Sequence, residues 1–361
     1  MAKYRWAELL AAEDLGASGT KVIDIKVTKP ISQIDIKFTV TKAGDGMSAG
    51  VPANITKIEI VDGSTRLVSL SGYELQALDY YNHPGKQFEH GQELTANSEE
   101  GHFVIDFGRW LWDEALAFDP SRFVNPQLRI TWDEDVTDTS ATANECEVWA
   151  AIFDEKEISP IGFLSAIEEY DYTCGAANSY ETIKLPDDMV VRQMLVRAYQ
   201  DGYEPWYQID EARLDENNME RIIFEYTNLE NYYRRMKGMW PRIEVYGVWN
   251  ITDSERTFYV PCTDYWAQVL LVGHGTAGNL TVTTDDLRGG KIGVTSSATG
   301  EFTAHSIGYL PWHCYQFPFG KKDDIEDWWD PKDRNPRLRL RASTGATSGT
   351  GEVVLEKLYR Y

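Results

Sequence analysis

A turn-and-strand module occurs twice in this chain of 361 residues. Residues 119–130 read DPSRFVNPQLRI, and residues 330–340 read DPKDRNPRLRL. Each copy has an Asp-Pro pair and then an Asn-Pro pair, followed by Leu-Arg and an aliphatic residue. The residues that define the turns are Asp119, Pro120, Asn125 and Pro126 in the first copy and Asp330, Pro331, Asn335 and Pro336 in the second. Proline lacks an N–H and pushes the preceding residue toward extended geometry, so each Asn-Pro is predicted to end a turn and begin a strand.

Apolar and polar residues alternate with a period of two around both modules, which is typical of β-strands. Leu128, Ile130 and Trp132 are expected to face a core, and Leu338 and Leu340 take the same positions in the second copy. The arginines between them are then outward positions of a strand. Further strands are expected at residues 31–40, 102–110, 146–153, 181–185, 189–199, 242–249, 266–273, 279–284 and 351–359.

The two halves also share the order of their other elements. A hairpin turning at residues 62–64 leads to a short helix at 71–82, and a short strand in the second half leads to a helix at 227–238. After each Asn-Pro strand comes a loop of small residues, at 135–145 and 343–351, and then a strand that opens with Glu-Val. The same series of elements is therefore predicted twice.

Eight antiparallel strands in two sheets with long connections form a jelly roll. We predict an all-β protein with two tandem eight-stranded antiparallel jelly rolls (β-sandwiches) and a few short helices. The first roll is expected at residues 21–157 and the second at 165–361, after an N-terminal amphipathic segment at 1–20. The second copy is longer, and we expect insertions at 206–219 and 307–320. The length agrees with two units, because single cores usually stop growing at roughly 250–300 residues.

The composition excludes several classes of protein. The formal net charge of −22 argues against a protein that grips a nucleic-acid backbone, because such surfaces are basic. The four cysteines are widely separated and form no CxxC pair, so we expect buried free thiols and neither a zinc site nor a disulfide scaffold. No stretch approaches the about 18 apolar residues that a membrane-spanning helix needs.

Two kinds of chemistry deserve comparison with this pattern. The six histidines are scattered (His83, His90, His102, His274, His305 and His313), which does not favour the metal site of a two-domain cupin. Acidic residues lie beside tryptophans at residues 323–330, as they do in glycoside hydrolases. Trp328-Trp329 directly precede the repeated Asp-Pro turn, however, so we interpret them as a structural plug. We predict no catalytic residue, cofactor or metal ligand.

Residues 55–82 read ITKIEIVDGSTRLVSLSGYELQALDYYN, a strand pair with a tight turn and a following short helix. With the length and the tandem repeat, this passage resembles the double jelly-roll major capsid proteins of tailless icosahedral viruses, the adenovirus-hexon-like lineage. The resemblance implies a homotrimer whose six rolls form a pseudo-hexameric capsomer, with loop insertions as towers. The implied partners are further copies of the chain, minor capsid or vertex proteins and an internal membrane, without sequence-specific nucleic acid. The implied location is the virion, assembled in the host cytoplasm; membrane-containing bacteriophages and archaeal viruses are the nearest comparison.

The N-terminal residues KYRWAELLAA predict a short amphipathic helix. Tyr4, Trp6, Leu9 and Leu10 can form one apolar strip with cationic residues beside it. Such a helix could lie at a lipid interface at the capsomer base, or it could pack on its own roll or on a neighbouring subunit. Both alternatives are open at this point.

Two further function classes also remain open. A carbohydrate-binding or glycoside-hydrolase-like double jelly roll would act as a monomer or dimer and would expose an aromatic platform over acidic residues. A minor capsid or spike protein would share the sheets but occur in few copies per particle. A shell protein, in contrast, needs large complementary surfaces and a stable oligomer.

Overall fold

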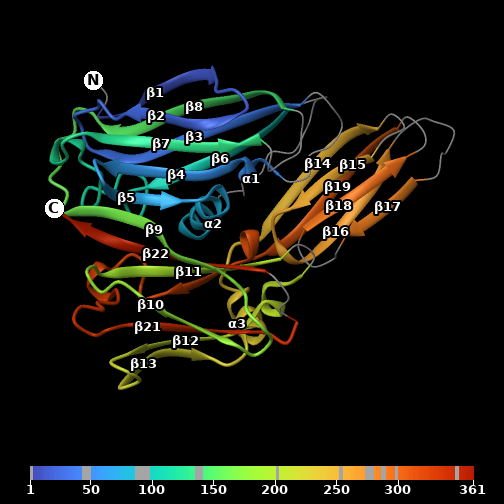
Figure 1. The fold of residues 1–361 in the computed structure, drawn as a ribbon. Coiled ribbons are helices and arrows are strands. Elements are labelled where there is room, and N and C mark those ends of the chain that lie inside the picture. The colour runs from blue at the N-terminus through green and yellow to red at the C-terminus, as the bar shows by residue number, and fades with distance from the viewer. Residues whose placement is uncertain are drawn as a thin grey trace.

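Two jelly rolls and a projecting third unit make up the part of the chain that the computed structural model describes (Figure 1). The described residues are 3–42, 50–85, 98–134, 141–200, 203–251, 255–272, 280–285, 290–296, 300–345 and 349–361. The loop centres at 135–140 and 346–348, His90, His274 and the glycine-rich residues 273–279 and 287–289 lie outside this set.

The first roll contains two four-stranded groups, in the orders β1-β8-β3-β6 and β2-β7-β4-β5. Its elements are β1 (Tyr4–Asp14), β2 (Ser18–Asp24), β3 (Ile31–Lys42), α1 (Val51–Asn54), β4 (Ile55–Asp62), β5 (Thr65–Leu70), α2 (Gly72–Asn82), β6 (Ser98–Asp106), β7 (Pro126–Asp133) and β8 (Ala141–Phe153). The predicted hairpin is confirmed, because β4 pairs with β5 antiparallel up to Asp62 and Thr65. The predicted helix at residues 71–82 is confirmed as α2.

The second roll repeats this topology strand for strand, with the orders β9-β22-β11-β20 and β10-β21-β12-β13. Its elements are β9 (Gly162–Thr173), β10 (Tyr180–Lys184), β11 (Val191–Tyr199), β12 (Ile209–Glu216), β13 (Arg221–Tyr226), α3 (Leu229–Met236), β20 (Cys314–Pro318), β21 (Arg337–Ala342) and β22 (Thr350–Arg360). Helix α3 follows β13 as α2 follows β5. The double jelly roll predicted from the repeat is therefore the observed fold.

The insertion that lengthens the second half lies elsewhere than we expected. It consists of two three-stranded sheets, β14-β19-β16 and β15-β18-β17, which project from one end of the rolls as a tower (Figure 1). Its strands are β14 (Ile243–Ile251), β15 (Glu255–Val260), β16 (Thr263–Val272), β17 (Leu280–Asp285), β18 (Gly290–Ser296) and β19 (Gly300–Tyr309). The insertion expected at 206–219 is wrong, because these residues form β12 and its flanking turns. The residues of the second expected insertion, 307–320, contain the end of β19 in the tower and strand β20 of the roll.

The predicted N-terminal helix is also wrong, because residues 4–14 form strand β1. This strand pairs antiparallel with β8, from Tyr4 opposite Phe153 to Asp14 opposite Glu145. The local pattern of apolar residues suits a helix, but the open edge of β8 offers a full ladder of hydrogen bonds, which an isolated short helix cannot match. The segment at 1–20 thus supplies β1 and the start of β2. None of the described helices is long and apolar enough to cross a membrane.

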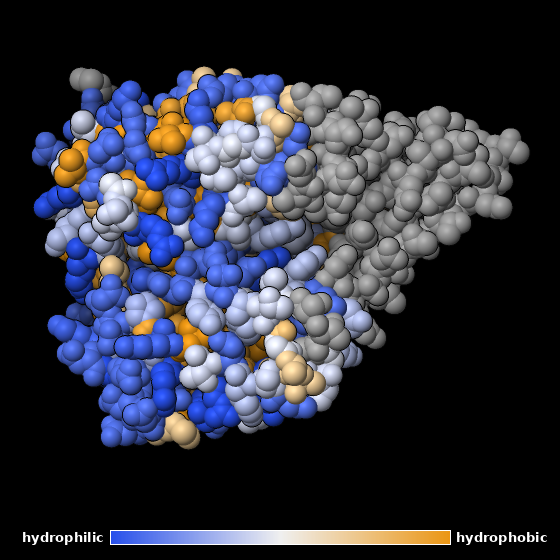
Figure 2. Space-filling model, viewed as in Figure 1, coloured by the Kyte–Doolittle hydropathy of each residue, from blue (hydrophilic) through white to orange (hydrophobic). Residues whose placement is uncertain are grey.

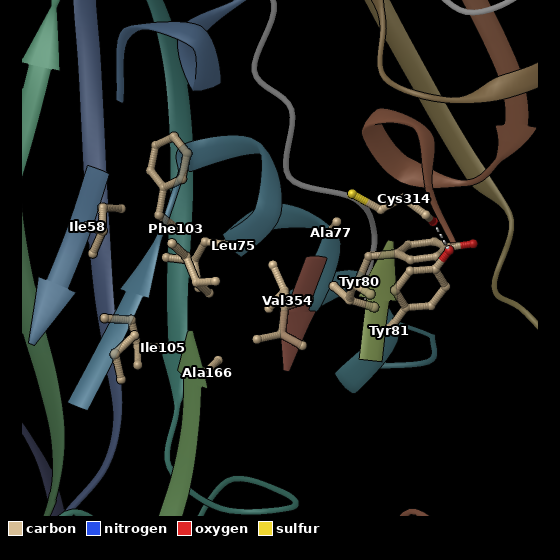
Figure 3. Close-up of a cluster of buried hydrophobic side chains, with 14 of the residues drawn as sticks. Ile58, Leu75, Ala77, Tyr80, Tyr81, Phe103, Ile105, Ala166, Cys314 and Val354 are labelled. Atoms are coloured by element: carbon tan, nitrogen blue, oxygen red, sulfur yellow. Dashed lines mark hydrogen bonds between the residues drawn. The ribbon is translucent and has the colours of Figure 1, made fainter. Parts of the chain in front are cut away.

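The core follows the predicted alternation in both rolls. Leu128, Ile130, Leu338 and Leu340 are at most 1% exposed, while the arginines between them lie half-buried on the other face. One hydrophobic cluster runs through both rolls and the helices between them (Figure 3). In the space-filling view the outer surface of the rolls is mainly hydrophilic, with small hydrophobic groups between (Figure 2).

The two rolls join edge to edge. Strand β5 of the first roll and β9 of the second meet at one parallel bridge, between Ser69 and Ile167, which makes a continuous eight-stranded sheet. Helix α2 lies between the rolls beside this joint (Figure 1). Because both strands of a parallel pair run in the same direction, the two rolls stand side by side and point the same way.

Candidate functional site

The repeated turns have the same geometry in both rolls. The carboxylates of Asp119 and Asp330 each accept a hydrogen bond, at 3.1 Å, from the backbone N–H two residues later, in Ser121 and Lys332. Pro126 is the first residue of β7, and Pro336 directly precedes β21. Strands β7 and β21 hold the same place in their sheets, between β2 and β4 and between β10 and β12.

The residue before each Asp-Pro turn closes the sandwich from inside. Phe118 bridges Ile31 at the start of β3, and Trp329 bridges Val191 at the start of β11, with two backbone hydrogen bonds of 2.7–3.2 Å in each case. Phe118 is 0% exposed and Trp329 is 7% exposed. Both aromatic rings therefore lie beneath their turns.

The acidic segment beside Trp328 and Trp329 is not built as a sugar-binding platform. Both indole rings are buried, and Nε1 of Trp329 donates to a carboxylate oxygen of Glu216 at 2.7 Å. Asp327 accepts a hydrogen bond from the N–H of Lys321 at 2.7 Å, so its carboxylate stabilises a turn. A ring that stacks on a sugar needs a broad exposed face, whereas Trp328 is only 5% and Trp329 only 7% exposed.

One histidine lies among carboxylates. His83, just after α2, has Nδ1 at 2.7 Å from Asp79 and Nε2 at 3.5 Å from Asp106. Burial raises the pKa of Asp106 to about 6, against the lowering effect of His83. Each ring nitrogen faces a different carboxylate, and one ligand atom from each of the three residues lies within 4.8 Å of the other two. The arrangement suits an imidazole ring that hydrogen-bonds on two sides.

The apolar side of the joint is formed by phenylalanines. Phe163 of β9 packs on Phe107 and Phe118 of the first roll, at ring-centroid distances of 6.0 and 5.3 Å. Backbone hydrogen bonds hold β9 in place, from Leu164 N–H to Phe107 O at 2.9 Å and from Ala117 N–H to Gly162 O at 3.0 Å. The start of β9 thus fills the open side of the first sandwich.

Buried charged groups form the polar side of the joint. Arg192, 1% exposed, donates from Nη1 to Glu356 at 3.0 Å and to the side-chain oxygen of Asn82 at 3.0 Å. Arg197 pairs with Glu352 at 2.8 Å. Such pairs are costly to break, because the remaining partner stays buried and unpaired. Asn82 is the last residue of α2, so this network ties the helix to the second roll.

Helix α2 brings a carboxyl group into the same joint. Ser71 and Glu74 form a capping box: the N–H of Ser71 donates to Oε2 of Glu74 at 2.7 Å. Desolvation, and then the charges of Glu352 and Glu168, raise the pKa of Glu74 to about 8. No described residue hydrogen-bonds to Oε1 of Glu74. Glu74 is therefore protonated at neutral pH and sits at the centre of the contact between the rolls.

The matching side of the second roll is open in this chain. Strands β13 and β20 are at the edges of the described sheets, and a pocket of about 480 Å³ lies between them. Phe319 and Trp329 line it, with ring centroids 4.8 Å apart, together with Phe224, Asp327 and Asp330. In the first roll the corresponding place is filled by β9.

The residues predicted to contact a membrane are divided between two sides of β1. Tyr4 and Trp6 lie on the same face of the strand, where the ring of Tyr4 packs on Trp112 and Phe153, at 4.7 and 5.7 Å, and Trp6 is 42% exposed. Leu9 and Leu10 are partly buried against the core, next to an irregularity in the pairing with β8. The four residues therefore do not form one apolar strip.

Solved structures of viral capsid proteins have a similar architecture. The major capsid protein P2 of bacteriophage PM2 aligns with 99% of this chain and 98% of its own length, at 9% identity and a TM-score of 0.56. The fold is that of the double jelly-roll major capsid proteins. The major capsid protein of Sulfolobus Turreted Icosahedral Virus (STIV) covers 99% of this chain and 97% of its own, at 10% identity and a TM-score of 0.60. The PBCV-1 virus capsid protein covers 98% of this chain and 93% of its own, at 9% identity and a TM-score of 0.59.

No protein-family model and no curated protein sequence matches the chain. At 9–10% identity the similarity to the capsid proteins establishes the double jelly-roll fold over the whole length. The sequence reasoning found the turns of this fold but missed the residues of the joint. Arg192 and Glu356 lie in ordinary strands, and their only sequence signal is a charge at a position that alternation predicts to be buried.

Proposed function

We propose that this chain is the major capsid protein of an icosahedral virus and assembles as homotrimeric, pseudo-hexameric capsomers. Its role is structural and not catalytic. The proposal is supported by full-length similarity to major capsid proteins of a bacteriophage, an archaeal-type turreted virus and PBCV-1. The observation that carries it is the joint between the two rolls.

The joint is heterologous, since the β5 side of one roll meets the β9 side of the next. A contact between different faces either closes into a ring or continues as a filament. Strand orders are the same in both rolls, so the second roll has its own β13 side and the first roll its own β1 side. Six rolls in a ring require three chains, which agrees with a trimer that imitates a hexagon.

Light scattering coupled to size-exclusion chromatography tests the proposal. We expect a stable species at three times the chain mass of 41.1 kDa. Electron microscopy of the same fraction should show a pseudo-hexagonal outline. A species of single-chain mass across the accessible concentration range would refute the capsomer and would favour a monomeric binding protein or enzyme.

The end of the rolls opposite the tower is our proposed inner surface. Trp110, Leu111, Val124 and Ile161 are exposed there, at 38–95%. The surrounding loops, such as residues 319–336, carry more acidic than basic residues. Acidic loops disfavour an anionic bilayer, so we propose that minor capsid proteins, or a membrane reached through the apolar side chains, meet this end inside a virion assembled in the host cytoplasm. Co-flotation with neutral and with anionic vesicles separates these partners: binding only to anionic vesicles would contradict the apolar contact.

A further inference from the structure

We infer that the outer face of β1 and β8 in one copy docks on β13, α3 and the open pocket of the second roll in the next copy. The inference rests on the proposed closed oligomer and specifies which residues meet in it. Its template is the joint inside the chain, because both rolls have the same strand order and each position in one joint has a counterpart in the other.

Strand pairing fixes the residue correspondence. Ile31 and Val191 are equivalent, because each bridges the aromatic residue before its Asp-Pro turn. Ile31 lies opposite Ile152 and Val191 opposite Lys357. Continuing this register aligns the Glu-Val pairs at 147–148 and 352–353, which open the sequence-predicted last strands.

The same register matches β1 to β9. In β1, Trp6 lies opposite Ala151 and Glu8 opposite Trp149. In β9, Ala166 lies opposite Glu356 and Glu168 opposite Val354. Trp6 therefore corresponds to Ala166 and Glu8 to Glu168. By the same count, Trp149 corresponds to Val354 and Glu147 to Glu352.

In the joint inside the chain, this face of the second roll packs on α2. Val354 lies beside Leu75 and Ala77 of that helix (Figure 3). Glu356 accepts a hydrogen bond from the side-chain amide of Asn82 at 2.9 Å. On the equivalent face of the first roll, Trp112 packs on Tyr4 and Phe153 at one end, and Trp6 is 42% exposed farther along the strand. A second copy would cover this exposed part of the face with the equivalent helix, α3.

The charges on the two free faces are complementary. Helix α3 exposes Arg234, which pairs with Glu230 at 2.6 Å, and Arg235 in its last turn, and Met239 beyond it is 76% exposed. The β1–β8 face presents the carboxylates of Glu8, which lies opposite Trp149, and Glu147, which accepts a hydrogen bond from the indole N–H of Trp149. Docking places arginine near glutamate and methionine near indole rings, both of which are favourable contacts.

At the pocket of the second roll, two apolar residues of the joint inside the chain correspond to two charged residues. Counting from the equivalent Phe118 and Trp329, Leu116 of the first roll corresponds to Asp327 of the second. Counting along β9 and β1, Phe163 corresponds to Lys3. An apolar neighbourhood inside the chain, where Leu116 bridges Gly162, is thus replaced between copies by a carboxylate and an ammonium group. Asp327 is exposed at the rim of the pocket, where it can receive that lysine.

A disulfide test follows from the bridge between Ser69 and Ile167. Ser69 corresponds to Glu225 on β13 and Ile167 to Ala7 on β1, so Ala7→Cys with Glu225→Cys should link neighbouring copies. Within one chain β1 and β13 lie at opposite sides of the molecule (Figure 1), which excludes an internal bond. The four native cysteines are buried and do not compete.

The matched control is Ala12→Cys with Glu225→Cys. Residue 12 is on the same strand but about 16 Å farther along, beyond the roughly 7 Å between Cα atoms that a disulfide can bridge. After mild oxidation we expect a covalent trimer from the first pair and single chains from the control. A trimer by light scattering without the first cross-link would overturn the docking inference and leave the capsomer standing. A single-chain mass would overturn the capsomer itself.

Charge exchange gives a second, independent readout. Glu8→Arg with Glu147→Arg should lower the trimer fraction at least tenfold at a fixed protein concentration. Adding Arg234→Glu and Arg235→Glu to the same chain should restore it. Dissociation without restoration would show that these charges do not face each other and would overturn the proposed pairing.

Discussion

Replacing Glu74 with Gln should remove a large part of the pH dependence of stability. Burial and two neighbouring carboxylates raise the pKa of Glu74 from its ordinary value of 4.5 to about 8. The folded protein therefore holds a proton that the unfolded chain releases above pH 4.5. Its contribution to the free energy of unfolding is fully present below pH 4.5 and is lost as pH rises to 8.

The size of the effect follows from the width of this window. Each unit of pKa difference changes the free energy of unfolding by about 1.4 kcal/mol, so the loss between pH 5 and pH 8 is about 4 kcal/mol. Gln has the size of protonated Glu, carries no proton to release, and keeps an oxygen that can accept the N–H of Ser71. The free energy of unfolding of the variant should therefore increase relative to that of the native protein as pH rises.

Thermal unfolding of both proteins at pH 5, 6, 7 and 8 measures this gain. We expect the melting-temperature difference, variant minus native, to increase steadily over the series. Asp106→Asn is the matched control: its carboxyl is also buried, but its pKa is raised only to about 6, so its gain should level off above pH 6. Parallel pH curves for the Glu74 variant and the native protein would refute a buried, protonated Glu74.

Three further outcomes test the packing. Phe118→Ala should lower the free energy of unfolding by about 3–5 kcal/mol, because it empties a fully buried site. The control Val124→Ala, at a side chain 95% exposed, should have little effect. Equal melting temperatures for the two variants would contradict the role of Phe118 in closing the sandwich. Arg192→Met should cost about 3–5 kcal/mol by leaving the carboxylate of Glu356 buried without its cationic partner. The loss should be smaller when Arg192→Met is combined with Glu356→Leu. Burial raises the pKa of the Cys174 thiol to about 11. Thiol reagents at pH 8 should therefore label Cys174 only after the protein unfolds. Fast labelling of Cys174 in the folded protein would refute its burial.

The sequence was sufficient for those features that local chemistry determines. An Asn-Pro before an alternating strand specifies its own geometry, and the strand launched by Pro126 was found with its core residues Leu128 and Ile130. Helix α2 could be predicted because Ser71 and Glu74 form its cap and apolar residues follow at helical spacing. Repetition of such local signals in one order revealed the two rolls.

The remaining features depend on partners distant in the sequence. Residues 4–14 have the apolar spacing of a helix, and only the edge of β8, more than 130 residues later, makes them a strand. Tower strands alternate like roll strands, so their sequence does not tell which sheet they join. The contact of Arg192 with Glu356 spans 164 residues, and no local pattern connects them.

The connection at residues 154–161, between β8 and β9, has a consequence for reversibility. A tethered pair of rolls meets at a fixed effective concentration, whereas separate chains must meet by diffusion. Dilution therefore acts on only three of the six joints in a ring. The charge pairs proposed for those three joints use the exposed side chains of Arg234 and Arg235, whereas the Arg192–Glu356 pair inside the chain is buried. Dissolved salt screens exposed charges over about 8–10 Å at physiological ionic strength. Raising salt should release whole chains with paired rolls, so a particle could be taken apart and rebuilt without any roll refolding.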